Sequence, residues 1–202
     1  MKKLLYTLLA VSLIFSACKK EEETPTNNTN NNNSALAIGD SHQGGIIFYL
    51  DGNGGGLIAA STDQSEPAQW GCYGTVVSGA DGTAIGTGAQ NTIDIVNADC
   101  TTTDSTYLTA ANICSNLTLG GYTDWFLPSK DELNEMYLNA MYLNIGQGPP
   151  LGNLGATDLI IYWSSSEDTL NNGYNAYGQN FVDGNVWIND KVAYYVRAVR
   201  AF

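Results

Sequence analysis

The spacing of apolar residues changes along the chain and predicts strands near both ends of the folded part, with helices between them. Apolar runs at residues 45–50 and 57–60 flank a Gly-rich turn, which is typical of a β-hairpin. A second hairpin is expected around Asp183-Gly184-Asn185, and the alternating segment 194–202 predicts a final strand. The remaining assignments are strands at 159–165, 179–182 and 186–188, and a mostly irregular stretch at 63–90.

Three segments in the middle of the chain have helical spacing. Asn91 is a suitable cap for a helix over residues 92–98, and residues 106–117 predict a second helix. Ser129 and Glu132 form a capping-box pattern at the start of a third helix, which runs to about residue 144. Two to three helices with antiparallel strands at both ends and long irregular loops predict an α+β fold, and pairing of the terminal strands in one sheet fits this order.

The N-terminal part of the chain differs from the rest. Residues 1–17 combine two lysines with an apolar run of 12 residues, too short to cross a bilayer, as in a secretory signal peptide. The end of this segment resembles the lipobox of bacterial lipoproteins, which implies that Cys18 is lipidated and anchors the protein in a membrane. Residues 18–37 predict a disordered, Asn-rich tether before the domain at 38–202.

A charged run at residues 19–23 follows the predicted lipidation site. It resembles the surface-export signal of lipoproteins in some Gram-negative groups, which implies a lipid anchor in the outer membrane and exposure at the cell surface. A generic solubilising spacer is the alternative interpretation of the same run.

The charge balance restricts the class of ligand. The 202-residue chain has a formal net charge of −12, and residues 34–202 hold 17 acidic and four basic residues, a formal charge of −13. Such a domain repels phosphates and other polyanions, so we exclude nucleic acid and heparin-like partners and favour neutral glycans, cations or basic proteins. The single histidine, His42, excludes a multi-His metal site.

Three segments carry a resemblance to a known family. Residues 120–133, with the block Asp-Trp-Phe-Leu-Pro-Ser, residues 162–167 and residues 196–200 resemble the Lcl C-terminal domain family, over residues 38–202 as a whole. The resemblance implies a C-type-lectin-like fold and a secreted or surface protein with a binding or adhesion role. It brings no catalytic residues. The chain lacks the collagen-like repeats of the adhesin after which the family is named.

The cysteines predict one disulfide in the domain. Export to an oxidising compartment favours a bond among the three that remain after Cys18. Thirteen residues separate Cys100 from Cys114, and we predict this pair, with Cys72 as a buried free thiol. The pair Cys72–Cys100 is the rival assignment.

Rings and amides gather in the segment 166–190. Flat aromatic side chains stack on sugar faces, and amides donate and accept hydrogen bonds, so this segment is the expected binding surface for a neutral glycan or a surface protein. Trp125 and Trp163 are expected in the core instead. The candidate ligand-binding residues are Glu167, Tyr174, Tyr177, Asn180, Trp187 and Asn189.

Calcium binding and hydrolase activity are two further interpretations, which the sequence supports less well. Asn189 and Asp190 loosely resemble the calcium–sugar motif of C-type lectins, although Ile188 interrupts it, and the Gly-rich turn 51–56 lacks most EF-hand ligands. A carboxylate pair that includes Glu167, with Glu66 or Glu132, would suit a glycosidase. We predict no catalytic residue and no required cofactor. Adjacent Ser41 and His42 would point to opposite faces of a strand, so they would not form a catalytic dyad.

The sequence therefore predicts a lipid-anchored cell-envelope protein with a non-enzymatic binding or adhesion domain. An envelope hydrolase and a structural envelope protein that binds only another protein are the two alternatives.

Overall fold

The computed structural model describes residues 35–102, 107–143 and 159–202. The predicted signal peptide (1–17), the predicted lipidation site Cys18 and the predicted tether up to residue 34 lie outside the described residues, as does the start of the helix predicted from residue 106. Residues 35–202 form one compact unit. In the described ranges, no helix has the length and apolar character needed to cross a bilayer.

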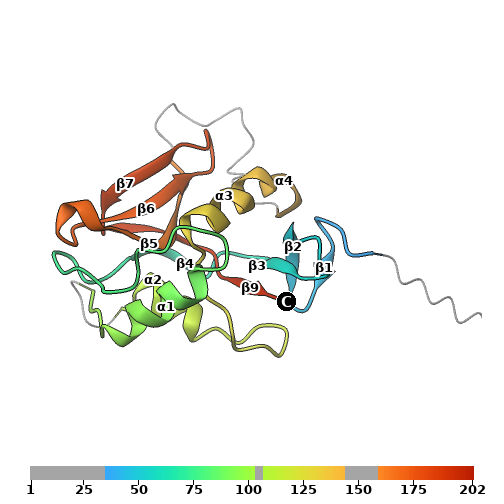
Figure 1. The fold of residues 1–202 in the computed structure, drawn as a ribbon, viewed down its shortest axis with the longest axis horizontal. Helices are drawn as coiled ribbons and strands as arrows, with labels where there is room; N and C mark the ends of the chain where they lie inside the picture. The colour runs from blue at the N-terminus through green and yellow to red at the C-terminus, as the bar shows by residue number, and fades with distance from the viewer. Residues whose placement is uncertain (1–34, 103–106, 144–158) are drawn as a thin grey trace, which may run out of the picture. The chain divides into compact units, whose positions relative to one another are not determined.

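A four-stranded antiparallel sheet joins the two ends of the domain (Figure 1). The predicted first hairpin forms it, and the last strand pairs with that hairpin through Leu57 opposite Ala201. The expected pairing of terminal strands is therefore confirmed. The strands, in spatial order, are β1 (Ser41–His42), β2 (Gly45–Leu50), β3 (Gly56–Ala60) and β9 (Val199–Ala201).

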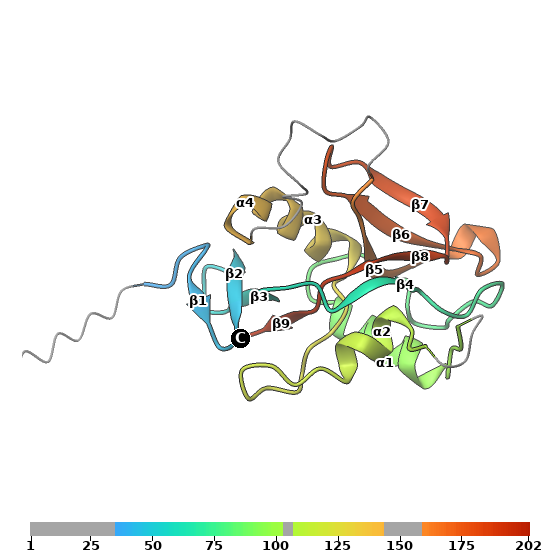
Figure 2. The ribbon, with the colours of Figure 1, turned by 180° about the vertical axis from the view of Figure 1, so that it is seen from behind.

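A five-stranded sheet makes the larger part of the fold (Figure 2). Its β5–β8 pairing is parallel and its other pairings are antiparallel. A short 3-10 helix, η1 (Thr169–Asn171), connects β5 with β6. The strands, in spatial order, are β4 (Ser65–Gln69), β8 (Ala193–Val196), β5 (Ile161–Asp168), β6 (Asn175–Asn180) and β7 (Val186–Asp190).

The structure corrects two strand assignments. The segment 194–202, predicted as one strand, divides into β8 and β9, which belong to different sheets. Arg197 lies at the division: its side chain is buried, pairs with Asp63 and donates to the carbonyl of Ala60. The stretch 63–90, predicted as mostly irregular, contains β4, because pairing with β8 overrides the weak local preference of a segment that holds Pro67.

The helices follow the predicted order, with different ends. They are α1 (Gly88–Asn97), α2 (Ala110–Ser115), α3 (Lys130–Leu138) and α4 (Ala140–Leu143). Thr87, not Asn91, occupies the cap position of α1. Asn91 is instead buried within α1, where its amide donates to the carbonyl of Gly82 and to the hydroxyl of Ser165.

The capping box at the start of α3 is confirmed. The Ser129 hydroxyl accepts from the Glu132 N–H, and Glu132 Oε2 accepts from the Ser129 N–H at 2.7 Å. Glu132 is completely buried, and its Oε1 accepts from the N–H of Gly86 at 2.8 Å. Burial raises the pKa of Glu132, while its hydrogen bonds to backbone N–H groups oppose that shift. Glu132 therefore joins the start of α3 to the loop that precedes α1.

Two apolar clusters form the core on either side of the central strands. Trp70, Trp125 and Trp163 belong to the first cluster, and the core positions predicted for Trp125 and Trp163 are confirmed. Each of these three indoles donates to a backbone carbonyl, to those of Ser164, Leu119 and Ala68 respectively. Trp70 and Trp163 therefore link segments that are distant in sequence as well as filling the core.

We predict that Glu132→Gln destabilises the domain by about 1–3 kcal/mol, because the new NH₂ group faces a backbone N–H and leaves buried donors unsatisfied. The free energy of unfolding from urea denaturation measures this change. Glu135→Gln is the matched control on the same helix, since Glu135 is half-buried whereas Glu132 is completely buried. Equal destabilisation by the two substitutions would contradict the proposed role of Glu132.

Candidate functional site

A buried ion pair between Glu167 and Lys191 lies at the centre of the candidate site. Lys191 Nζ contacts Glu167 Oε1 at 2.5 Å, and both side chains are completely inaccessible to solvent. The ammonium group also donates to the carbonyl oxygens of Cys72 and Thr75 and lies 4.2 Å from the ring centre of Trp70. Its three hydrogen bonds and the aromatic face replace the water that burial removes.

The same two side chains attach the loop of residues 72–80 to β5 and to the turn between β7 and β8. Glu167 Oε2 accepts from the Val77 N–H at 2.8 Å, and the Glu167 N–H donates to the carbonyl of Ala80. Residues 72–80 are therefore attached both to β5, through Glu167, and to the turn between β7 and β8, through Lys191. Burial lowers the pKa of Lys191, and the Glu167 carboxylate opposes that shift.

The disulfide joins Cys72 to Cys100, so the predicted pair Cys100–Cys114 was wrong and the rival assignment is the one observed. Cys114 faces the core from α2, where it is fully buried and burial raises its pKa. Gly71, with φ of +104°, turns the chain toward Cys100, and a Cβ at this position would lie 3.0 Å from the Cβ of Cys100. Cys72 pairs with Cys100 because the chain at Gly71 passes close to Cys100. The number of residues between two cysteines does not reveal such a close approach.

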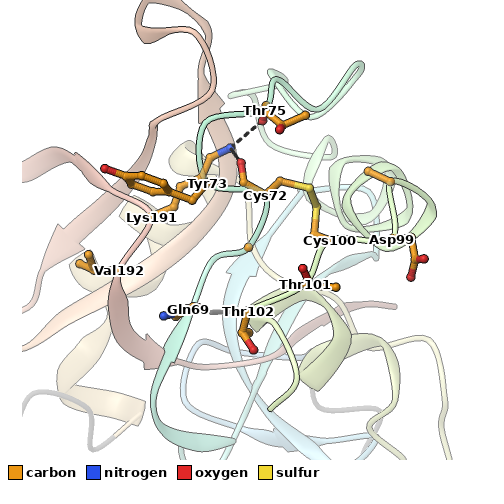
Figure 3. A pocket seen from close by; sticks show the side chains of 12 residues that line it. Gln69, Cys72, Tyr73, Thr75, Asp99, Cys100, Thr101, Thr102, Lys191 and Val192 are labelled. Carbon is orange, nitrogen blue, oxygen red and sulfur yellow. Dashed lines mark hydrogen bonds between the residues drawn. A yellow bond between two sulfur atoms is a disulfide. The ribbon is translucent and has the colours of Figure 1, made fainter. Parts of the chain in front are cut away.

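A cleft of about 650 Å³ opens beside the disulfide (Figure 3). Its walls come from the end of β4, the loop after Trp70, the segment following α1 and the turn between β7 and β8. Figure 3 shows the Lys191 ammonium directed at the carbonyls of Cys72 and Thr75, so the cation is occupied within the protein. We name this cavity the disulfide cleft; its hydrogen-bonding side chains are Gln69, Tyr73, Thr75, Asp99, Thr101 and Thr102.

Two exposed tyrosines meet next to the disulfide cleft. The rings of Tyr73 and Tyr174 lie 5.1 Å apart in a T-shaped arrangement and are 57% and 45% exposed. A backbone hydrogen bond from the Gly74 N–H to the Gly173 carbonyl joins the two loops that carry them. Tyr73 was not among the predicted binding residues, because nothing in the sequence places its loop beside Tyr174.

The predicted binding residues separate into buried and accessible groups. Glu167 and Asn180 are buried, and the Asn180 side-chain oxygen accepts from the Val182 N–H. Tyr174 and Trp187 are exposed, and Tyr177 and Asn189 are half-buried. The structure thus gives Glu167 and Asn180 internal roles, whereas the Tyr174 and Trp187 rings are accessible to solvent.

The candidate ion-binding groups have local structural roles or stand apart. Asp190 is exposed, whereas the side-chain nitrogen of Asn189 is buried and has no hydrogen-bond partner among the residues that the structure describes. Asp51 Oδ1 accepts from the N–H groups of Asn53 and Gly55, and so shapes the Gly-rich turn. Within the described ranges, no three His, Cys, Asp or Glu side chains gather where they could hold a metal ion. The ring of His42 packs against Phe202.

Every basic side chain of residues 34–202 lies in the described part and contacts a carboxylate. Each of these pairs has at least one member in the segments that carry the family resemblance. Arg200 contacts Asp124 and lies over the Tyr122 ring at 3.8 Å. The Arg200 contact lowers the pKa of Asp124. The four pairs are Lys130–Asp131, Glu167–Lys191, Asp63–Arg197 and Asp124–Arg200.

The fold and site define an α+β domain with one disulfide, an internally neutralised set of cations and a polar cleft. The chain belongs to the Lcl C-terminal domain family, whose sequence model matches residues 61–200. Among curated proteins, no sequence matches the chain. The residues that carry the resemblance are mainly structural, since Trp125, Leu127, Ser129 and residues 162–167 are all buried.

We predict that Lys191→Met lowers the free energy of unfolding by about 3–5 kcal/mol, because it leaves the Glu167 carboxylate buried without its counter-ion. Lys130→Met is the matched control: the Lys130–Asp131 pair is partly exposed, and its loss should cost at most about 1 kcal/mol. Urea denaturation at neutral pH measures both. Similar values for the two variants would show that the buried pair contributes no more than a surface pair.

Proposed function

We propose that the protein is a lipid-anchored envelope protein whose domain binds a neutral glycan in the disulfide cleft and catalyses no reaction. The observation that carries this proposal is the cleft itself, with an exposed tyrosine pair beside it and a lining of mostly uncharged hydrogen-bonding groups. Its volume falls within the range of about 300–1,000 Å³ that is usual for ligand sites.

The chemistry of the cleft suits a hydroxyl-rich ligand. Thr75 and Thr101 bring hydroxyl groups to its walls, whereas the Thr102 hydroxyl already donates to the Tyr107 carbonyl. Tyr73 brings an aromatic ring that a sugar face can stack upon. Asp99 adds one carboxylate, which can accept hydrogen bonds from sugar hydroxyls. A ligand in the cleft would therefore find both an apolar platform and polar partners.

The charge distribution supports a neutral ligand over an anionic one. All four basic side chains of the domain are paired with carboxylates, and the domain carries a formal charge of −13. An anionic ligand would meet long-range repulsion and would have to break an internal ion pair to gain a cationic contact. We therefore place heparin-like glycans outside the ligand class.

The placement of Glu167 supports the non-enzymatic part of the proposal. Both of its carboxylate oxygens have partners inside the protein, Lys191 and the Val77 N–H, and the side chain has no access to solvent. A hydrolase that used Glu167 would need to dismantle this arrangement. The side chain of Glu66 lies outside the part that the structure describes, and Glu132 is occupied in the capping box.

The remaining elements of the proposal rest on fold order and on the N-terminal sequence. Pairing of the terminal strands, together with long loops that carry the cleft, supports a C-type-lectin-like fold. The lipobox-like end of the signal peptide supports lipidation of Cys18, and a tether of about 19 residues would give the domain a mean reach of roughly 25 Å. The charged run after Cys18 supports a place on the outer face of the outer membrane.

We predict that residues 34–202, with the disulfide intact, bind neutral glycans on an array, and that Tyr73→Ala weakens this binding at least about tenfold by removing the stacking ring. Tyr142→Ala is the matched control, because Tyr142 is similarly exposed but lies on α4, outside the cleft.

The array is probed once with calcium and once with chelator. Binding in both buffers supports the proposal as stated, and binding lost only with chelator assigns a role to Asn189 and Asp190. Failure to bind any glycan in either buffer would contradict the proposal and leave a protein partner as the leading explanation.

A further inference from the structure

Strand β7 forms one edge of the five-stranded sheet: β6 pairs with it on one side, and no strand of residues 35–102, 107–143 or 159–202 pairs with it on the other (Figures 1 and 2). The hydrogen-bond register identifies which of its backbone groups face outward. At the two ends of the β6–β7 ladder, the Asn180 N–H donates to the Asn185 carbonyl and the Lys191 N–H donates to the Tyr174 carbonyl. Asn180–Asn185 and Tyr174–Lys191 are therefore the hydrogen-bonded residue pairs at the two ends of the ladder.

Hydrogen-bonded and non-bonded pairs alternate along an antiparallel ladder. Between the two ends, the bonded pairs are therefore Gly178–Trp187 and Ala176–Asn189. The N–H and C=O groups of Val186 and Ile188 consequently point away from β6. These four groups lie in a row that an extended chain can pair with.

The side chains of β7 are apolar and accessible where this row lies. Val186, Trp187 and Ile188 are 46%, 36% and 49% exposed. Proteins usually protect an edge with a proline, a bulge, a lysine or a very short strand. The opposite edge of the same sheet, β4, has Pro67 and a register shift, whereas β7 pairs with β6 over five consecutive residues without one. The edge formed by β7 is thus open to pairing in a way that β4 is not.

The charges around β7 indicate the chemistry of the strand that would pair with it. Asp183 precedes the strand, Asp190 ends it, and both are exposed. The adjacent cation, Lys191, is buried against Glu167 and does not offset them at the surface. A second copy of this domain would bring another formal charge of −13 to the edge, so charge complementarity favours a basic partner over self-association.

We propose that β7 is a docking strand for an extended, basic segment of another protein, which adds to the sheet as a sixth strand. In antiparallel register, the segment places a Lys or Arg opposite Asp190 and apolar residues opposite Ile188 and Val186. Main-chain hydrogen bonds to Val186 and Ile188 hold the segment, and the alternating side chains select it. This surface is separate from the disulfide cleft and does not depend on glycan binding.

Amide hydrogen exchange measured by NMR on residues 34–202 tests the proposal directly. The probe is the terminally blocked peptide Thr-Lys-Thr-Val-Thr-Val-Thr at up to 1 mM, and the matched control peptide has Glu in place of Lys. We expect the basic peptide to slow exchange at Val186 and Ile188 at least about tenfold. Trp187 and Asn189 should change little, because their amides already bond to β6.

Two substitutions test the same edge from the protein side. Ile188→Pro removes one outward N–H without removing a β6–β7 hydrogen bond, and Ile188→Lys adds a cation that repels the basic peptide. Loss of peptide binding in both, with binding retained in Tyr73→Ala, supports the docking strand. Unchanged exchange at Val186 and Ile188 with 1 mM peptide would overturn the proposal, as would equal binding of the Glu peptide. Retained peptide binding in the Ile188→Lys variant would also overturn it. The Ile188→Lys variant still provides this test if the Ile188→Pro variant fails to fold.

Discussion

The ion pair between Glu167 and Lys191 is the interaction on which the loop-rich side of the domain depends. Transfer of two charges into the interior costs several kcal/mol for each ion unless every polar atom finds a partner. Here the backbone of residues 72–80 supplies those partners: two carbonyl groups bind the ammonium and one N–H binds the carboxylate. The loop therefore adopts its conformation because the buried charges require it to do so.

Both proposed binding surfaces are next to this interaction. The disulfide cleft is built on the loop that receives the Lys191 ammonium, and Tyr73 and Thr75 belong to that loop. The edge strand β7 ends at Asp190, immediately before Lys191, so the buried lysine also fixes where the strand stops. Cys72 contributes twice, through its carbonyl to the ion pair and through its sulfur to the disulfide. The ion pair and the disulfide therefore both fix the position of the loop that lines the cleft.

Local sequence signals predicted much of the fold but little of the site. The hairpin at 45–60 and the Ser129–Glu132 capping box depend on residues close in sequence, and both appear as expected. The division of 194–202 into β8 and β9, and the strand β4, depend on pairing between distant segments, which periodicity does not report. Glu167 illustrates the same limit for the site, because its partner Lys191 became apparent only when β5 and the β7–β8 turn were brought together.

A double-mutant cycle on Glu167→Gln and Lys191→Met tests the central claim most directly, since it separates the interaction between the two charges from the contribution of each side chain alone. Urea denaturation supplies the free energy of unfolding for the four proteins. The account predicts that the double variant is less destabilised than the sum of the single variants by about 1–3 kcal/mol. Additive effects, within about 0.5 kcal/mol, would contradict it and show that the two residues stabilise the domain independently.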